Sequence, residues 1–177
     1  ILGTGVGGGI VIGGRIHDGA QLIAGEWGHN PLPWPGDDER PGPDCYCGRR
    51  GCIETFLSGP GLAADHERVA GVTATPEAIA AAADAGDAIA ASTLARYVDR
   101  LGRGLATVVN LLDPEVIVLG GGLSHLPRLA RRAEAALAGH VFSDTVSTRV
   151  VKNRHGAAVG PRRGLALAFV VAMGDVT

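Results

Sequence analysis

Four side chains that can bind a metal ion lie close together in this sequence. His29 precedes three cysteines, Cys45, Cys47 and Cys52. One imidazole and three thiolates complete a tetrahedral structural zinc site, which leaves no open position for water or substrate and so disfavours a catalytic zinc. The alternative is a set of free thiols beside an unrelated histidine. An odd number of cysteines within eight residues suits a disulfide framework poorly. The sequence therefore predicts one structural zinc ion per chain.

The segment between His29 and Cys45 is rich in proline and acidic residues and lacks apolar periodicity. Such composition predicts an irregular surface excursion. A metal ion bound at both ends would offset the entropy that ordering this loop costs. We therefore expect a zinc-binding insertion over about residues 29–54.

Two glycine clusters, at residues 3–9 and 120–122, could approach phosphate groups. The first contains a G-x-G-x-x-G spacing but precedes a strand pattern, so it lacks the context of a dinucleotide fold. It can be an ordinary tight hairpin, or a turn whose N–H groups bind phosphate. The second follows an apolar strand, where we expect a helix to begin and to favour an anion. Together they predict a nucleotide cradle formed by Gly3, Thr4, Gly5, Gly120, Gly121 and Gly122.

The remaining patterns predict the elements that would position these groups. Short strands are expected at residues 10–12 and 15–17, joined by a glycine turn. A Thr-Pro cap predicts a helix from Pro76 towards Ala85. One apolar stripe predicts a longer helix that ends before Asp113-Pro114, and it consists of Leu94, Val98, Leu101, Leu105, Val108 and Leu112. A strand at 116–119 and a helix at about 126–137 follow. This alternation indicates an α/β layer fold with a parallel sheet component.

The bulk composition limits the classes of function. With 177 residues, 46% of them hydrophobic, the chain can bury one core, so one globular domain is expected. A formal net charge of -2 with dispersed basic residues makes nucleic acid an unexpected partner. No apolar run approaches the roughly 20 residues that span a bilayer, so we expect a cytoplasmic protein with no membrane partner.

Four motifs resemble the ROK family of sugar kinases. They are Leu2-Gly-Thr-Gly-Val-Gly-Gly-Gly9, Gly25-Glu-Trp-Gly-His-Asn-Pro-Leu-Pro33, Cys45-Tyr-Cys-Gly-Arg-Arg-Gly-Cys-Ile-Glu54 and Leu112-Asp-Pro-Glu-Val-Ile-Val-Leu-Gly-Gly-Gly-Leu-Ser124. The residues around Trp34 and after Glu54 are similar to those of the fructokinase branch, including fructokinases that accept mannose.

The resemblance implies an actin-like ATPase (ribonuclease-H-like) fold of two lobes that close over a sugar and MgATP. It implies phosphoryl transfer to a hexose, with fructose expected first and mannose or glucose as alternatives, and a homodimer. The implied sugar ligands are Glu26, His29 and Glu54, and the implied zinc ligands are His29, Cys45, Cys47 and Cys52. Thr4 and its neighbouring glycines would contact phosphate, and Gly120 to Gly122 would contact adenosine.

Residues 1–177 correspond by resemblance to the C-terminal lobe. The family's Asp-x-Gly-Gly-Thr loop and its Asn-Asp pair, which carries the general base, have no counterpart in this sequence. We therefore expect the 177-residue chain alone not to phosphorylate sugar. An isolated lobe of this kind would expose apolar surface and self-associate.

The C-terminal tail departs from the family pattern. Residues 152–156 fit it, but Ala157 replaces an expected acidic residue, and the usual Gly-Ala-Ala helix start is absent. One explanation is a frameshift near Ala157, and the other is divergence of a helix at about 165–173.

Two other functions are compatible with the same motifs. A similar zinc-bearing domain senses sugar in ROK-type transcriptional repressors. A zinc-stabilised interaction module without catalysis is the third interpretation.

Overall fold

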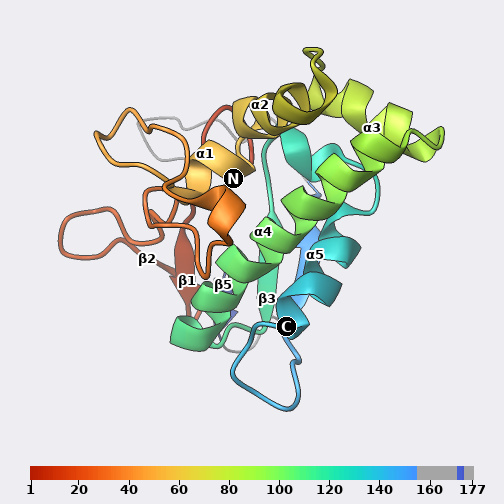
Figure 1. Cartoon of the computed structure of the whole chain (residues 1–177). Coiled ribbons are helices and arrows are strands. Elements are labelled where there is room, and N and C mark those ends of the chain that lie inside the picture. Colours follow the sequence, from red (N-terminus) through yellow and green to blue (C-terminus); the bar gives the residue numbers. More distant parts are fainter. Residues whose placement is uncertain (155–170, 174–177) are drawn as a thin grey trace.

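A five-stranded mixed sheet forms the frame of the protein (Figure 1). The computed structural model describes residues 1–154 and 171–173. The strand order is β2-β1-β5-β3-β4. The strands are β1 (Ile10–Ile12), β2 (Arg15–His17), β3 (Val116–Leu119), β4 (Arg149–Lys152) and β5 (Val171–Met173).

The β1-β2 hairpin confirms the first two predicted strands. The two strands pair antiparallel, with Val11 opposite Ile16. Gly13 and Gly14 form the turn with φ of 56° and 74°, a region in which side chains other than glycine are strained.

The described residues also form five α-helices and two short 3-10 turns. The helices are α1 (Ile53–Leu57), α2 (Gly59–Ala70), α3 (Pro76–Asp84), α4 (Ala88–Leu112) and α5 (Leu129–Ala138), and the turns are Asp37–Glu39 and Gly122–His125. The N-cap side chains of α2, α3 and α4 accept hydrogen bonds from the backbone N–H of the third residue of each helix. These caps are Ser58, Thr75 and Asp87. The predicted Thr75-Pro76 helix start is confirmed.

Helix α4 is the central helix, and it crosses in front of β3 beside α5 (Figure 1). The predicted apolar stripe is buried at its first four positions and half-buried at the last two. Leu101 and Leu105 are fully buried and belong to the same hydrophobic cluster as Ile117 of β3. The helix ends where predicted, because Asp113 is left-handed and Pro114 follows it.

The second half of the chain confirms the α/β layering. β3 and β4 are parallel neighbours with Ile117 opposite Val150, and α5 forms the connection between them. β5 completes the sheet between β1 and β3, parallel to the first and antiparallel to the second. Only part of the sheet is therefore parallel.

Two predicted helix positions are wrong. The helix after the second glycine cluster begins at Leu129 instead of about 126, and the residues directly after the glycines form a four-residue 3-10 turn. No α-helix N-terminus therefore lies at Gly122. Residues 171–173 are strand, not the end of a helix, because their backbone pairs with β1 and β3. The expectations for residues 155–170, including the frameshift, lie outside the described residues.

Large apolar side chains also remain on the surface. Leu22, Ile23, Leu111 and Phe142 are all more than 60% exposed. Ile23 and Leu111 line a cavity of about 260 Å³. This surface agrees with the expected self-association, which stays a prediction. Among the described residues, no single helix is long and apolar enough to span a bilayer. Helices α3 and α4 taken together have the length and apolar composition of a span, but the pair is bent by 118°.

The sequence patterns did not reveal a buried ionic cluster that fixes the Pro-rich excursion to α4. Glu39 is 9% exposed and accepts hydrogen bonds from Arg100 (2.7 Å) and Arg103 (2.8 and 2.9 Å). Arg103 also donates to the carbonyl oxygens of Pro33 and Trp34. Burial alone raises the pKa of Glu39, but these arginines and the Gly36 N–H outweigh it and lower that pKa to about 2. The excursion is thus anchored through a charged carboxylate.

Candidate metal centre and sugar site

Backbone pairing between the two ends of the excursion brings the candidate ligands together. The Ile53 N–H donates to Asn30, the Glu54 N–H donates to Gly28, and the Leu32 N–H donates to Gly51. A bridge also joins Pro31 to Cys52. Because residues 28–32 lie antiparallel to residues 51–54, His29 sits beside the start of α1. The cysteine turn at 45–50 folds over the same point, where the Cys45 N–H donates to Arg49.

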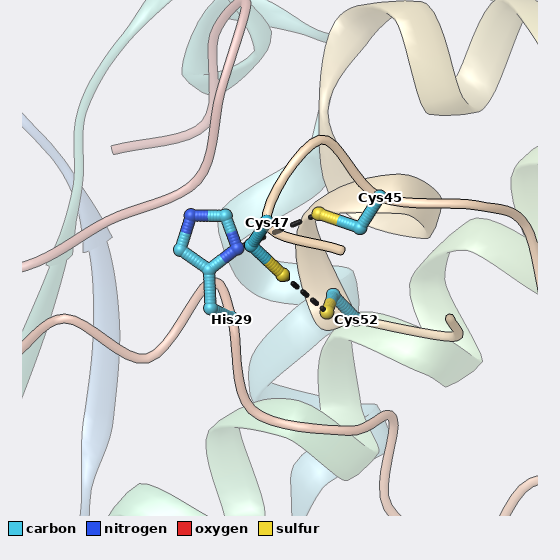
Figure 2. A group of neighbouring side chains, drawn as sticks. All are labelled: His29, Cys45, Cys47 and Cys52. Carbon is cyan, nitrogen blue, oxygen red and sulfur yellow. Dashed lines mark hydrogen bonds between the residues drawn. The ribbon is translucent and has the colours of Figure 1, made fainter. Parts of the chain in front are cut away.

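The four predicted metal ligands converge in space (Figure 2). Their donor atoms all lie within 4.8 Å of one another. The Cys47 and Cys52 sulfurs are 3.6 Å apart, and the Cys45 sulfur is 3.5 Å from His29 Nδ1. A zinc tetrahedron has edges of about 3.8 Å between sulfurs and about 3.6 Å between sulfur and nitrogen. Two of the donor pairs match these edges, and the whole set lies within 4.8 Å, so the four residues fit a zinc ion.

The thiols differ in their acidity. The Arg49 N–H is the main cause that lowers the pKa of Cys47 to about 7. Burial, together with a smaller contribution from the neighbouring thiols, raises the pKa of Cys52 to about 12. A bound cation reverses such an effect, because it favours the thiolate that ligates it. The donor set is thus one that zinc would deprotonate on binding.

The second ring nitrogen of His29 faces away from the sulfurs. His29 Nε2 lies 2.8 Å from the Tyr46 hydroxyl. The two rings meet edge to face, with centroids 5.0 Å apart. His29 therefore has one nitrogen turned to the metal ligands and one turned to a hydroxyl group.

The two predicted sugar carboxylates flank the first glycine loop. Glu54 Oε2 accepts a hydrogen bond of 2.8 Å from the Val6 N–H. A Cβ at Gly5 would lie 2.6 Å from Glu54 Oε2, and one at Gly7 would lie 3.6 Å from Glu26 Oε2. The loop can approach both carboxylates because it lacks side chains there. Glu26 and Glu54 thus lie against one loop. His29 is close to both, because its neighbour Gly28 pairs with the backbone of Glu54.

Gly28 packs against the same loop. A Cβ at Gly28 would clash with the Val6 carbonyl oxygen, a backbone atom that cannot turn aside. We expect Gly28→Ala to lower the free energy of unfolding by about 2–3 kcal/mol. Urea denaturation checks this value. Gly122→Ala is the matched control, because its Cβ meets nothing within 4 Å; an equal loss in both variants would contradict the prediction.

The two glycine clusters meet, and a cleft opens beside them. The Leu2 N–H donates to Gly120, and the Leu123 N–H donates to Leu2. The cleft has a volume of about 590 Å³. Of the predicted nucleotide residues, Gly3, Thr4 and Gly122 line it.

The other three predicted nucleotide residues have different contacts. Gly5 faces Glu54, while Gly120 and Gly121 hold the backbone of Leu2. Sequence reasoning missed the residues from Thr73 to Glu77, together with Gly59 and Pro60, which form the opposite wall. The Thr-Pro helix start at residue 75 was visible, but nothing in its spacing indicated that it faces the glycines.

Comparison with known proteins places this arrangement in a family. The sequence pattern of the ROK family matches residues 1–170 of this chain. The chain belongs to the ROK family. Its structure accordingly has the ROK kinase fold, of the actin-like ATPase type.

A curated relative, the N-acetyl-D-glucosamine kinase of Shigella flexneri serotype 5b, is 37% identical over 166 residues. That match covers 92% of this chain and 55% of the relative. This ROK chain thus spans about half the length of the curated relatives it matches. The resemblance to the family is confirmed, whereas these relatives do not support the fructokinase branch specifically.

Solved ROK structures superpose on this chain. A ROK hexokinase from Thermus thermophilus has a TM-score of 0.75 and 32% identity, and the match covers 88% of this chain and 51% of the other. A ROK glucokinase from Streptomyces griseus, solved with glucose and AMPPNP, has a TM-score of 0.75, 26% identity and coverages of 88% and 55%. A ROK transcriptional regulator, a homologue of the Escherichia coli MLC protein, has a TM-score of 0.71, 26% identity and coverages of 85% and 40%.

Proposed function

We propose that this chain is the C-terminal lobe of an ATP-dependent hexose kinase, with a structural zinc site next to its sugar site. The observation that carries the proposal is the gathering of Glu26, His29 and Glu54 around the glycine loop, beside a cleft that the same loop lines. Carboxylates and an imidazole N–H are the groups that bind several sugar hydroxyls at once. The cleft provides bare backbone and the Thr4 hydroxyl for phosphates.

We propose N-acetylglucosamine as the first substrate to test. Its support is the 37% identity to a kinase that is named for that sugar. Fructose, predicted from the residues around Trp34, is the competing hexose, and glucose is favoured by the glucokinase structure. The three sugars differ at carbons 1 and 2, so side-by-side affinities discriminate between them.

In this proposal His29, Cys45, Cys47 and Cys52 hold the zinc ion. Zinc would supply no reacting group, since four protein ligands leave no open position. Ligation through Nδ1 leaves the proton of a neutral imidazole on Nε2, so His29 donates a hydrogen bond on the side away from the sulfurs. Glu26 and Glu54 accept hydrogen bonds from sugar hydroxyls and orient the sugar towards the cleft. MgATP would bind in that cleft.

The sugar site is tested by Glu54→Gln. The amide keeps an oxygen for the Val6 N–H but removes the charge, and charge-assisted hydrogen bonds are about twice as strong as neutral ones. We expect sugar affinity to fall about tenfold or more by calorimetry or NMR titration of the zinc-loaded chain. We also expect the chain alone to show no ATP-dependent phosphorylation. Glu115→Gln, at an exposed residue directly before β3, is the matched control. Equal affinity in wild type and both variants would contradict the proposed site.

A sugar-sensing repressor domain is the second candidate, because a ROK regulator shares the fold at a TM-score of 0.71. Nucleotide binding in the cleft distinguishes the two functions. AMPPNP binding with Thr4-dependent affinity favours the kinase, whereas sugar binding without nucleotide binding favours the sensor.

A further inference from the structure

Tyr46 contacts the candidate sugar site at His29, although the motif comparison gave it no role. It stands between two candidate zinc ligands, Cys45 and Cys47, so a bound metal would fix its backbone on both sides. Its ring is 84% exposed, yet its hydroxyl reaches back to His29 Nε2 at 2.8 Å.

The hydroxyl occupies the functional nitrogen of His29. Since Cys45 Sγ faces Nδ1 at 3.5 Å, the metal-facing nitrogen is Nδ1, and Nε2 is the nitrogen left to donate to a ligand. Tyr46 accepts at that nitrogen. It is thus placed as a sugar hydroxyl would be.

We propose that the Tyr46 hydroxyl is hydrogen-bonded to His29 Nε2 in the absence of sugar and that a sugar hydroxyl displaces it. Tyr46 thereby lowers the affinity of the site for sugar. This inference rests on the proposed function. Displacement is feasible because water can solvate the exposed ring after it leaves. A sugar can displace the phenol because it also forms hydrogen bonds with Glu26 and Glu54, whereas the phenol has a single oxygen.

Tyr46→Phe tests the exchange. The variant keeps the ring and removes the competing oxygen, so we expect sugar to bind about threefold to tenfold more tightly than to wild type. Calorimetry on the zinc-loaded 177-residue chain, with N-acetylglucosamine, glucose and fructose as probes, measures this. Zinc content and AMPPNP affinity should not change. Phe142→Leu, at an aromatic ring that is 98% exposed on the loop after α5, is the control and should leave sugar affinity unchanged.

A spectroscopic readout separates displacement from a structural role. In the ¹⁵N spectrum of histidine-labelled protein, sugar should move the His29 Nε2 resonance of wild type. In the proton spectrum, sugar should shift the Tyr46 ring signals towards the values of a fully solvated tyrosine. Unchanged affinity in Tyr46→Phe overturns the proposal, and so does weaker affinity, which would mean that the hydroxyl contacts the sugar. If neither protein binds any sugar, the proposed function fails and displacement fails with it. Sugar binding by wild type distinguishes the first failure from the second.

Discussion

Cys52→Ser is expected to abolish stoichiometric zinc binding and to unfold the excursion over residues 29–54. Cys52 is 1% exposed and is the N-cap residue of α1, so its sulfur is the donor most deeply set in the fold. Structural zinc sites supply on the order of 10 kcal/mol of apparent binding free energy, which is coupled to folding. Even if about a third of this is lost, the Tm falls by roughly 10 °C for a chain of this size. Metal analysis and calorimetry check the two values.

The same substitution should also eliminate sugar binding, because Glu54 lies two residues after Cys52 and His29 is itself a ligand. Chelation of zinc from wild type should reproduce both effects. Tyr46→Phe is the matched control for metal content, since it changes the cysteine turn without removing a ligand. One zinc ion per chain and an unchanged Tm in Cys52→Ser would show that Cys52 is not a zinc ligand.

The zinc cluster could be predicted from sequence because its ligand types are distinctive and three of them are close in the chain. The fourth, His29, was assignable because the Pro-rich excursion leaves at His29 and returns at Cys45, so one ion could bind both of its ends. The positions of Glu26 and Glu54 came from the family resemblance. Their contact with the glycine loop depends on close backbone approach at Gly5 and Gly28, which no spacing reveals.

The arginines of α4 show where periodicity fails. Leu101 and Leu105 were placed in the core correctly, but Arg100 and Arg103 are 3% and 6% exposed on the same helix. Charged residues are almost never fully buried unless they are paired, and their partner lies more than sixty positions away, in a segment without periodicity. The sequence alone therefore could not predict that either the arginines or their carboxylate partner is buried.

The second glycine cluster was misjudged for a related reason. A glycine run after a strand is typical of a direct turn into a helix, yet here Gly121 has φ of 82° and its Cβ position lies 2.5 Å from the Leu2 carbonyl oxygen. The cluster thus serves to join the first loop to β3, and α5 begins only after a 3-10 turn. A long-range backbone contact determined the local structure.

The excursion is consequently fixed at two separate points. Zinc would hold its ends at residues 29 and 45–52, and Glu39 holds its outer part against α4. Loss of either anchor has a different consequence, since the first also positions His29 and the second does not touch the sugar ligands.

Glu39→Gln is therefore expected to destabilise the protein strongly while leaving one zinc ion bound. Removal of one partner from a buried ion pair costs about 3–5 kcal/mol, and we expect the lower end, because Asp65 and Asp99 still pair with Arg100 and Arg103. Asp37→Asn is the matched control. Its carboxylate is fully exposed and only 3.7 Å from Arg40, so a change of less than about 0.5 kcal/mol is expected.

The acid dependence of stability distinguishes this ion pair from simple packing. The pKa of Glu39 falls from 4.5 to about 2 in the folded protein, so its contribution is complete above about pH 4.5 and is lost as the pH falls towards 2. A shift of that size corresponds to about 3 kcal/mol. Wild type should therefore lose stability over this pH range, and the free energy of unfolding of Glu39→Gln should fall by about 3 kcal/mol less than that of wild type. Parallel acid profiles for the two proteins would mean that Glu39 acts through its shape and not its charge, and the arginines of α4 would then have to be neutralised by other groups.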